Sequence, residues 1–541
     1  MQNPMNLEAA IARWSEQLGP DRVLTDPNLL TPFHYSTIAA KRRIPAVLRP
    51  STTEEIVALV KIAAEHSTPL YPISTGHNWG YGSANPVVND CVIVDLSDMT
   101  AIDASNIELG IITVEPGVTQ GMLRAFLDER GLPFLVPVHG GGPSCSLVGN
   151  AIERGYGITP YADHFAAVMG LEAVLPNGEC YHSALSDLGA PKVDRIFKWG
   201  IGPYLDGVFT QSNFGIVTRM SIALAPVPER VETFFFGVRS HEEFSEAVAA
   251  IRQVLRAVGN VTGSVNLMNA RRVLSMMEQY PADKVGPQGI VPTETIAAMA
   301  RRARVMPWTG IGAMYGTSKV VKAARSAIRH SLKGVARRLV FVSPARVQQG
   351  RRLLEFLPRN GGQRLWTYVS TLDKSLQLIA GSPSEIALPL AYWKSGAKPA
   401  PRSGQQFNPA ADGCGLIWYT PLVPMSPHCV LKYVEEVERV CAEHGIEPLI
   451  TLTSLSDRCF DSTVPLLFDR DDPEAAERAN ACYAALLSSG QALGCVPYRA
   501  GINSMHLYTG IDSAHWRLVK QLKTAIDPNN IMAPGRYCPL D

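Results

Sequence analysis

The segment Leu70-Tyr71-Pro72-Ile73-Ser74-Thr75-Gly76-His77-Asn78-Trp79-Gly80-Tyr81-Gly82-Ser83 decides the fold of this chain. It begins as an apolar run containing a proline and continues as small residues, with three glycines in seven positions. Glycine adopts positive φ and lets backbone N–H groups approach an anionic group closely. The segment therefore predicts a strand that leads into a phosphate-binding loop. The alternative is a glycine-rich turn with a packed aromatic residue.

Two further glycine-rich segments follow, at residues 139–150 and 200–218. Neither they nor the first segment contain a GxGxxG motif after a strand with an acidic residue downstream, or a GK[ST] loop. These absences disfavour a Rossmann dinucleotide site and a P-loop nucleotidase. Three such loops beside strand-like sequence instead predict one extended ligand that carries phosphates.

The composition is that of an ordinary globular protein. The chain has 541 residues, 46% of them hydrophobic and 18% charged, with a net charge of +1. This length predicts two or three domains, and the neutral balance gives no support for nucleic acid or a membrane as a partner. Residues 1–6 lack the features of a secretory signal, and the ten scattered cysteines contain no CxxC pair. A cytoplasmic protein with free thiols and no metal site is expected.

The chain divides by pattern into an N-terminal region of alternating strands and helices, a long middle region and a tail. In the N-terminal region, strands are expected at 44–50, 69–73, 91–96 and 110–118, and helices at 7–19, 53–63 and 119–130. Residues 231–489 contain two strand–helix groups, which predict a duplicated antiparallel α+β layer that covers the ligand. Residues 395–412 are expected to form an exposed loop, and a helix over 519–526 precedes a turn-rich tail.

Six ordered motifs resemble the vanillyl-alcohol oxidase/p-cresol methylhydroxylase flavoproteins. They are Pro72-Ile73-Ser74-Thr75-Gly76, Val114-Glu115-Pro116-Gly117-Val118, Gly149-Asn150-Ala151, Gly157-Ile158-Thr159-Pro160-Tyr161, Ser212-Asn213-Phe214-Gly215-Ile216-Val217-Thr218 and Asp527-Pro528-Asn529-Asn530. The resemblance implies an α+β fold with a two-part, PCMH-type FAD-binding domain and a central α+β cap domain. The expected divisions are 1–229 for FAD binding, 230–489 for the substrate cap and 490–541 for a segment completing the FAD domain and substrate site. It also implies homodimers or dimer-based oligomers.

The resemblance further implies a set of cofactor contacts. We expect FAD to contact Pro72, Ser74, Thr75, Gly76, His77, Asn78, Gly80, Gly141, Gly142, Cys145, Gly149, Asn150, Ser212, Gly215, Ile216, Val217 and Arg536. Backbone amides in these loops can bind the pyrophosphate without a cluster of lysines or arginines.

Family members that oxidise para-substituted phenols hold the phenolate between two tyrosines and an arginine. The matching residues are Tyr81, Tyr498 and Arg499. An arginine and two phenol O–H donors stabilise an anion, and the phenolate then favours hydride transfer from the para carbon to the flavin N5. The alternative is that Tyr81 only packs and that Arg499 pairs with a carboxylate.

The chain departs from this family pattern at three places. The position of the usual flavin-linking histidine is Leu416, and the position of the usual catalytic aspartate is Val138, followed by His139. The third departure is His77, where Ser74-Thr75-Gly76-His77 resembles the SGGH motif of berberine-bridge-type flavoproteins, whose histidine bonds the flavin covalently. We therefore predict covalent attachment through His77, with a phosphate- or backbone-bound neutral histidine as the alternative. A second link through Cys145 competes with a buried inert thiol there.

The missing aspartate leaves the mechanism open. Either His139 removes the proton, since a neutral imidazole has a suitable pKa, or the substrate needs no base there. The leading prediction is an FAD-dependent oxidoreductase, oxidase or dehydrogenase, of a para-substituted phenolic or related aromatic substrate. The alternative is an oxidative decarboxylase or tailoring oxidase of a larger carboxylated aromatic in secondary metabolism, with Tyr81, Tyr498 and Arg499 holding a carboxylate. A flavin-binding protein without turnover, or an electron-transfer subunit, is the remaining class.

Overall fold

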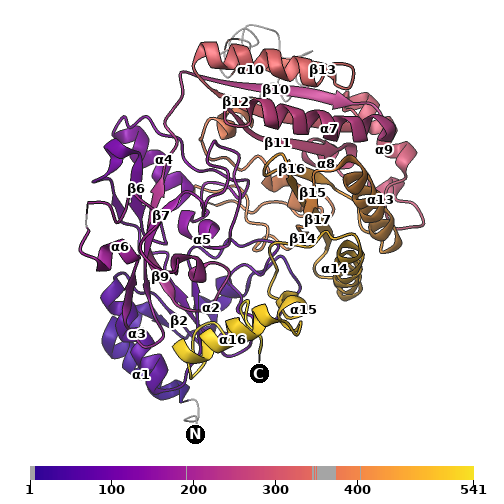
Figure 1. The fold of residues 1–541 in the computed structure, drawn as a ribbon. Coiled ribbons are helices and arrows are strands. Elements are labelled where there is room, and N and C mark those ends of the chain that lie inside the picture. The colour runs from indigo at the N-terminus through magenta and orange to yellow at the C-terminus, as the bar shows by residue number, and fades with distance from the viewer. Residues whose placement is uncertain are drawn as a thin grey trace.

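The computed structural model describes residues 6–540 except residues 191, 344–346, 348, 350–372, 374 and 403. Figure 1 shows two lobes, an indigo-to-magenta N-terminal lobe and a pink-to-brown lobe above it. The yellow C-terminal helices return to the N-terminal lobe. The chain is thus an α+β protein in which both ends contribute to one lobe.

A four-stranded sheet in the order β1-β2-β4-β3 supports the first glycine loop. Its strands are β1 (Val23–Leu24), β2 (Val47–Leu48), β3 (Leu70–Ile73) and β4 (Val92–Asp95), and the helices around it are α1 (Leu7–Leu18), α2 (Pro27–His34) and α3 (Thr53–Glu65). Helices α1 and α3 share an apolar core with one face of the sheet, and α2 shares a core with the other. Strand β3 runs parallel to β4, and the first glycine loop begins where β3 ends. The three glycines of this loop all have positive φ.

A five-stranded antiparallel sheet in the order β5-β6-β9-β7-β8 forms the rest of this lobe. Its strands are β5 (Ile102–Asp103), β6 (Ile111–Val114), β7 (Val168–Val174), β8 (Cys180–His182) and β9 (Ile216–Ala223), with helices α4 (Gln120–Glu129), α5 (Leu147–Ile152) and α6 (Ala184–Asp187). Helix α5 follows the second glycine loop, and the Ser146 side chain caps it by accepting the Gly149 N–H. The sheet therefore places the second loop beside the first.

The upper lobe is built on an eight-stranded antiparallel sheet in the order β13-β10-β12-β11-β16-β17-β14, with β15 paired to β17. Its strands are β10 (Arg230–Val238), β11 (Thr262–Asn269), β12 (Trp308–Gly316), β13 (Arg337–Val342), β14 (Cys414–Tyr419), β15 (Leu422–Pro424), β16 (Thr451–Ser454) and β17 (Cys459–Asp469). Its helices are α7 (His241–Val258), α8 (Ala270–Met277), α9 (Thr293–Ala303), α10 (Ser318–Ser331), α13 (Pro427–Glu443) and α14 (Pro473–Ala492). Pairing of β11 with β16 joins two strand–helix groups into one sheet, as the predicted duplicated layer requires.

The two faces of this sheet differ because side chains alternate along each strand. Val265, Leu267 and Leu452 point into the apolar core beneath α7, α10, α13 and α14. Their neighbours Asn266 and Thr453 line a cavity on the opposite face. One face of the sheet therefore stabilises the lobe and the other is free to bind a ligand.

The C-terminal segment is hydrogen-bonded to β3 of the four-stranded sheet. It contains α15 (Met505–Thr509) and α16 (Ala514–Ile526). Leu70 donates its N–H to the Ile531 carbonyl at 2.7 Å and accepts the Ala533 N–H at 2.8 Å. The buried Lys523 ammonium donates to Asp527 at 2.5 Å. These contacts hold the turn-rich tail in place.

Most predicted elements are present, with shifted ends. The strands expected at 44–50 and 110–118 shrink to β2 and β6, because only their central residues find partners. The helix expected at 519–526 starts earlier, where Ser513 caps it. The division expected at 489 falls inside α14, which continues to Ala492. Residues 395–412, apart from the undescribed 403, are irregular as expected. Asp412 holds this loop in place by accepting hydrogen bonds from Arg402 and Tyr392.

Candidate active site

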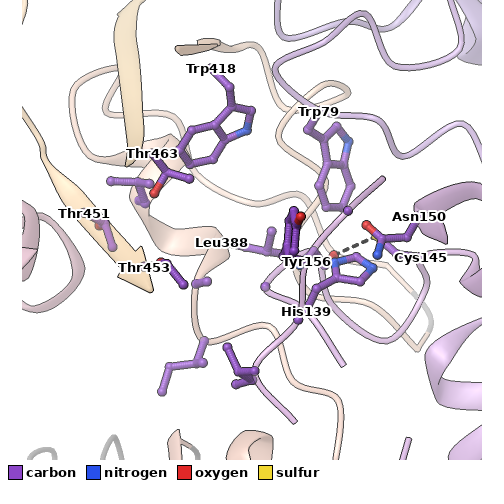
Figure 2. Close-up of a pocket in the computed structure, with 18 of the residues that line it drawn as sticks. Trp79, His139, Cys145, Asn150, Tyr156, Leu388, Trp418, Thr451, Thr453 and Thr463 are labelled. Carbon is purple, nitrogen blue, oxygen red and sulfur yellow. Dashed lines mark hydrogen bonds between the residues drawn. The ribbon is translucent and has the colours of Figure 1, made fainter. Parts of the chain in front are cut away.

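One cavity of about 730 Å³ lies between the glycine loops and the free face of the upper sheet. This volume is typical of a site for a cofactor or metabolite. Figure 2 shows Trp79, His139, Cys145 and Asn150 on one side, and Trp418 with Thr451, Thr453 and Thr463 across from them. The cavity thus has one wall from each lobe.

Eleven of the residues predicted to contact the cofactor line this cavity. Ten come from the glycine loops and the eleventh is Arg536; the ten are Pro72, Ser74, Thr75, Gly76, His77, Asn78, Gly141, Cys145, Gly149 and Asn150. The predicted contacts Gly80, Gly142, Ser212, Gly215, Ile216 and Val217 are not part of the cavity wall. Ile216 and Val217 are outside the wall because they lie in β9, where they pair with Val174 and Ala173 of β7 and are buried in apolar cores.

The cradle fits FAD. A Cβ on Gly149 would lie 2.6 Å from the Ser74 hydroxyl, and one on Gly141 would lie 2.8 Å from the Cys145 sulfur, so both positions need glycine to keep the backbone bare. Two buried polar atoms here, His77 Nδ1 and Ser144 Oγ, have no hydrogen-bond partner within the described part of the chain. Bare backbone and unpaired polar atoms are what a phosphate-bearing, heteroaromatic group requires.

His77 lies in the first glycine loop with its ring stacked on Trp79 at a centroid distance of 4.9 Å. Burial lowers the pKa of His77 to about 4, although a hydrogen bond with the Ser144 backbone acts in the opposite direction. The imidazole is therefore neutral at pH 7 and keeps a free nitrogen for bonding. Leu416, at the usual attachment position, faces the same cavity from β14 and is 3% exposed.

Cys145 lies at the start of α5 and donates its S–H to the Gly141 carbonyl at 3.0 Å. Burial raises the pKa of the Cys145 thiol to about 12. The thiolate needed for a covalent link is therefore scarce in this environment.

The structure brings Tyr81, Tyr498 and Arg499 together from opposite ends of the sequence. The Arg499 guanidinium lies 4.2 Å from the centroid of the Tyr81 ring. Burial raises the pKa of Tyr81 to about 12, although Arg499 opposes the shift, and burial raises the pKa of Tyr498 further. Both phenols are thus neutral and line the cavity, where Tyr81 donates its O–H to the Thr420 hydroxyl at 3.3 Å and Tyr498 is hydrogen-bonded to Asp461.

Glu153 is a member of the site that the sequence motifs did not single out. Its carboxylate pairs with Arg499 at 3.3 Å and with Arg536. Arg499 also donates to the Asn78 side chain at 2.5 Å. An ion pair with a carboxylate is the alternative role predicted for Arg499, and the structure shows this ion pair together with the contact to the Tyr81 ring. One carboxylate between two arginines leaves a net positive charge for an anion.

Asp461 is a second residue that the motifs missed. It lies in β17, is 5% exposed and lines the cavity. Burial raises the pKa of Asp461 to about 7, opposed by a hydrogen bond to Tyr498 and by the Arg499 charge. Its Oδ1 atom has no hydrogen-bond partner within the described part of the chain. A carboxyl group that exchanges its proton near neutrality is suited to acid–base work.

His139 lines the cavity but is poorly placed to remove a proton. Its Nδ1 accepts the Gly141 N–H at 3.1 Å, and Gln120 contacts its Nε2 at 3.1 Å. Burial lowers the pKa of His139 to about 3, with His164 and Arg499 adding to the effect. Such an imidazole is a weak base at neutral pH. The neighbouring Val138 is fully buried in an apolar core.

Comparison with known proteins agrees with this geometry. A model of the FAD binding domain matches residues 44–184. The chain is 37% identical over 536 residues to a 1'-carboxy-chondrochloren decarboxylase from Chondromyces crocatus, covering 99% of this chain and 98% of the relative. It is 29% identical to the flavoprotein subunit of a 4-cresol dehydrogenase (hydroxylating) from Pseudomonas putida, over 97% and 94% of the two chains.

The fold also matches a solved structure of p-cresol methylhydroxylase with substrate bound. The TM-score is 0.86 at 27% identity, over 99% of this chain and 98% of the other. The cradle that fits FAD, the cluster of Tyr81, Tyr498 and Arg499 in the cavity wall, and these full-length similarities lead to one assignment. The chain belongs to the p-cresol methylhydroxylase-related, PCMH-type family of FAD-dependent oxidoreductases.

Proposed function

We propose that this enzyme oxidises a para-substituted phenol that Tyr81, Tyr498 and Arg499 hold as a phenolate. The observation that carries the proposal is the meeting of the Arg499 guanidinium with the Tyr81 ring at 4.2 Å in the wall of the cavity. FAD, when bound, supplies the acceptor for the hydride that the para carbon loses. The Arg499 guanidinium stabilises the phenolate oxygen, and the Tyr81 O–H, which donates to the Thr420 hydroxyl in this structure, turns to donate to the bound phenolate.

We assign Asp461 as the group that accepts the proton of the phenol. Its free Oδ1 is the atom that receives the proton, and the Tyr498 hydrogen bond keeps the carboxylate oriented. This role takes the place of the base that is absent at Val138. His139 remains the alternative base, with the weaker support of its strongly lowered pKa.

Anaerobic bleaching of the flavin by 4-ethylphenol tests the proposal. We expect rapid bleaching in the wild type and a rate about 10–100-fold lower in Tyr81→Phe, because a hydrogen bond to a charged group is lost. Tyr161→Phe is the matched control, since Tyr161 is 43% exposed. No bleaching in the wild type contradicts the phenol oxidation, and equal rates in the two variants contradict the anchoring role of Tyr81.

Oxidative decarboxylation of a larger carboxylated phenol is the second candidate. The full-length relative at 37% identity, whose name describes a decarboxylase, favours it. Chemically, hydride loss from a phenolate leaves a quinone methide. Breaking the adjacent C–CO₂⁻ bond then moves its electron pair into the methide, releases CO₂ and restores the phenolate. Measuring CO₂ and flavin reduction together with 3-(4-hydroxyphenyl)propanoate separates the two candidates.

Further proposals concern the cofactor and the assembly. We infer a covalent FAD attached through His77, supported by its unpaired, buried Nδ1. A second link through Cys145 has less support because of its raised pKa. We also propose a cytoplasmic homodimer or dimer-based oligomer that acts in secondary metabolism, with 1–229 and 490–541 binding FAD and 230–489 covering the substrate. No helix in the described part of the chain has the length and apolar character to cross a membrane.

A further inference from the structure

A buried arginine with no counter-charge among the described residues lies at the start of α8. Arg272 is 8% exposed, yet neither Nε nor Nη1 of its guanidinium has a hydrogen-bond partner within the described residues. Burial lowers the pKa of Arg272 to about 10, so the group is still charged at neutral pH. The adjacent Arg271 has its charge neutralised in the usual way, by an ion pair with the buried Glu447 at 2.6 Å. An unpaired buried charge is costly, so Arg272 needs an anion from outside the chain.

Unpaired polar atoms share the cavity wall with this guanidinium. Ser264 Oγ, Asn266 Oδ1 and Thr451 Oγ1 are buried and lack a hydrogen-bond partner within the described residues. All three line the same cavity as Arg272. Buried polar groups are almost always hydrogen-bonded, and several unpaired ones beside a bare cation indicate a ligand site.

This cluster is separated from the phenol site by the width of two strand spacings. Asn266 in β11 lies opposite Thr453 in β16, and Thr453 lies opposite Asp461 in β17. At about 4.8 Å per strand, Asn266 is roughly 10 Å from Asp461. Figure 2 shows Thr451 and Thr453 across the cavity from the glycine-loop residues, so the cluster belongs to the wall opposite the FAD cradle.

We propose that Arg272 binds a carboxylate of the substrate, roughly 10 Å or more from the phenol oxygen, and that it thereby selects acidic aromatic compounds over neutral alkylphenols. The planar guanidinium matches a carboxylate through two parallel hydrogen bonds, and one buried positive charge balances one carboxylate. The exposed Arg304 lines the same cavity and adds positive charge outside the buried site. The proposal rests on the proposed function only for the aromatic head of the substrate.

Binding of two matched probes to the holoenzyme tests this site. The probes are 5-phenylpentanoate and its neutral amide, 5-phenylpentanamide, measured by isothermal titration calorimetry. Neither carries a phenol, so binding is read without any oxidation, and failure of this proposal is distinct from failure of the proposed function. We expect the wild type to bind the acid about 10–100-fold more tightly than the amide.

The variants assign that preference to Arg272. Arg272→Met should abolish it, Arg272→Lys should keep part of it, and Arg301→Met should keep all of it, because Arg301 is an exposed arginine on nearby α9. Flavin content, read by absorbance, should be the same in all variants. Equal binding of acid and amide by the wild type overturns the proposal without any variant. An unchanged preference in Arg272→Met, or loss of flavin from it, also overturns the proposal, the latter by making Arg272 a cofactor contact.

Discussion

Replacing Asp461 by asparagine tests whether a proton-exchanging carboxyl group faces the substrate. The structure raises the pKa of Asp461 from 3.8 to about 7, chiefly by burial. At ~1.4 kcal/mol per pKa unit, this corresponds to roughly 4 kcal/mol of preference for the neutral acid. Asparagine keeps the size and hydrogen-bonding capacity of the acid and cannot ionise.

The sign of the pH effect follows from proton counting. Between pH 3.8 and about 7 the folded protein holds the Asp461 proton and the unfolded chain releases it. The free energy of unfolding contributed by Asp461 is therefore largest below pH 3.8 and falls as the pH rises through about 7. Between pH 5 and pH 8 the wild type should lose roughly 3 kcal/mol relative to Asp461→Asn.

Infrared difference spectroscopy observes the proton directly. We expect the band of a protonated carboxylic acid in the wild type at pH 6, its loss with a midpoint near pH 7, and its absence from Asp461→Asn. Asp457→Asn is the matched control, because Arg256 and other contacts lower the pKa of the Asp457 carboxyl group. If no such band is present at pH 6, or if the wild-type and Asp461→Asn unfolding free energies run parallel from pH 5 to pH 8, the reasoning is wrong.

Three further changes have defined outcomes. Acid-precipitated wild type should stay yellow and His77→Ala should lose its flavin; complete release from the wild type would disprove the covalent link. Gly80→Ala should lower the free energy of unfolding by roughly 1–3 kcal/mol more than Gly396→Ala, because its Cβ would lie 2.2 Å from Trp418. Both glycines have positive φ and nothing lies near a Cβ at Gly396, so equal losses in thermal or denaturant unfolding would contradict the clash. Lys523→Met should cost roughly 3–5 kcal/mol in denaturant unfolding, since it leaves a buried carboxylate unpaired, and a loss below 1 kcal/mol would refute this role.

Local signals in the sequence were enough to predict the glycine loops and many helix ends. Thr52 and Asp472 cap α3 and α14 by accepting the backbone N–H groups of Glu55 and Glu474, and such a cap depends only on residues three or fewer positions away. The motif Gly80-Tyr81-Gly82 likewise pointed to Tyr81, which lines the cavity. Segments such as 44–50 were overestimated, because apolar residues predict a strand without showing where its hydrogen-bond partners end.

The missed site residues depend on contacts that no local pattern contains. Asp461 reaches Tyr498 only because β17 pairs with β16 and places alternate residues on the free face of the sheet. Arg272 resembles its neighbour Arg271 in sequence, and only the fold gives Arg271 the partner Glu447 and leaves Arg272 unpaired among the described residues. An acid within a largely apolar strand, as Asp461 is in 459–469, was the available signal for the first of these residues.

The two ends of the free sheet face impose different demands on a substrate. Under the two proposals above, a simple alkylphenol occupies the end near Asp461 and Arg499 but leaves the Arg272 guanidinium and its polar neighbours without partners among the described residues. A phenol with a carboxylate at the far end satisfies both, so the energetic difference between these substrates resides in the cap and not in the FAD cradle. Under these proposals, the separation lets a chain keep Tyr81, Tyr498 and Arg499 while acting on a longer, acidic compound. It also predicts that substrate preference in related chains follows the residue at the position of Arg272 more closely than it follows the glycine loops.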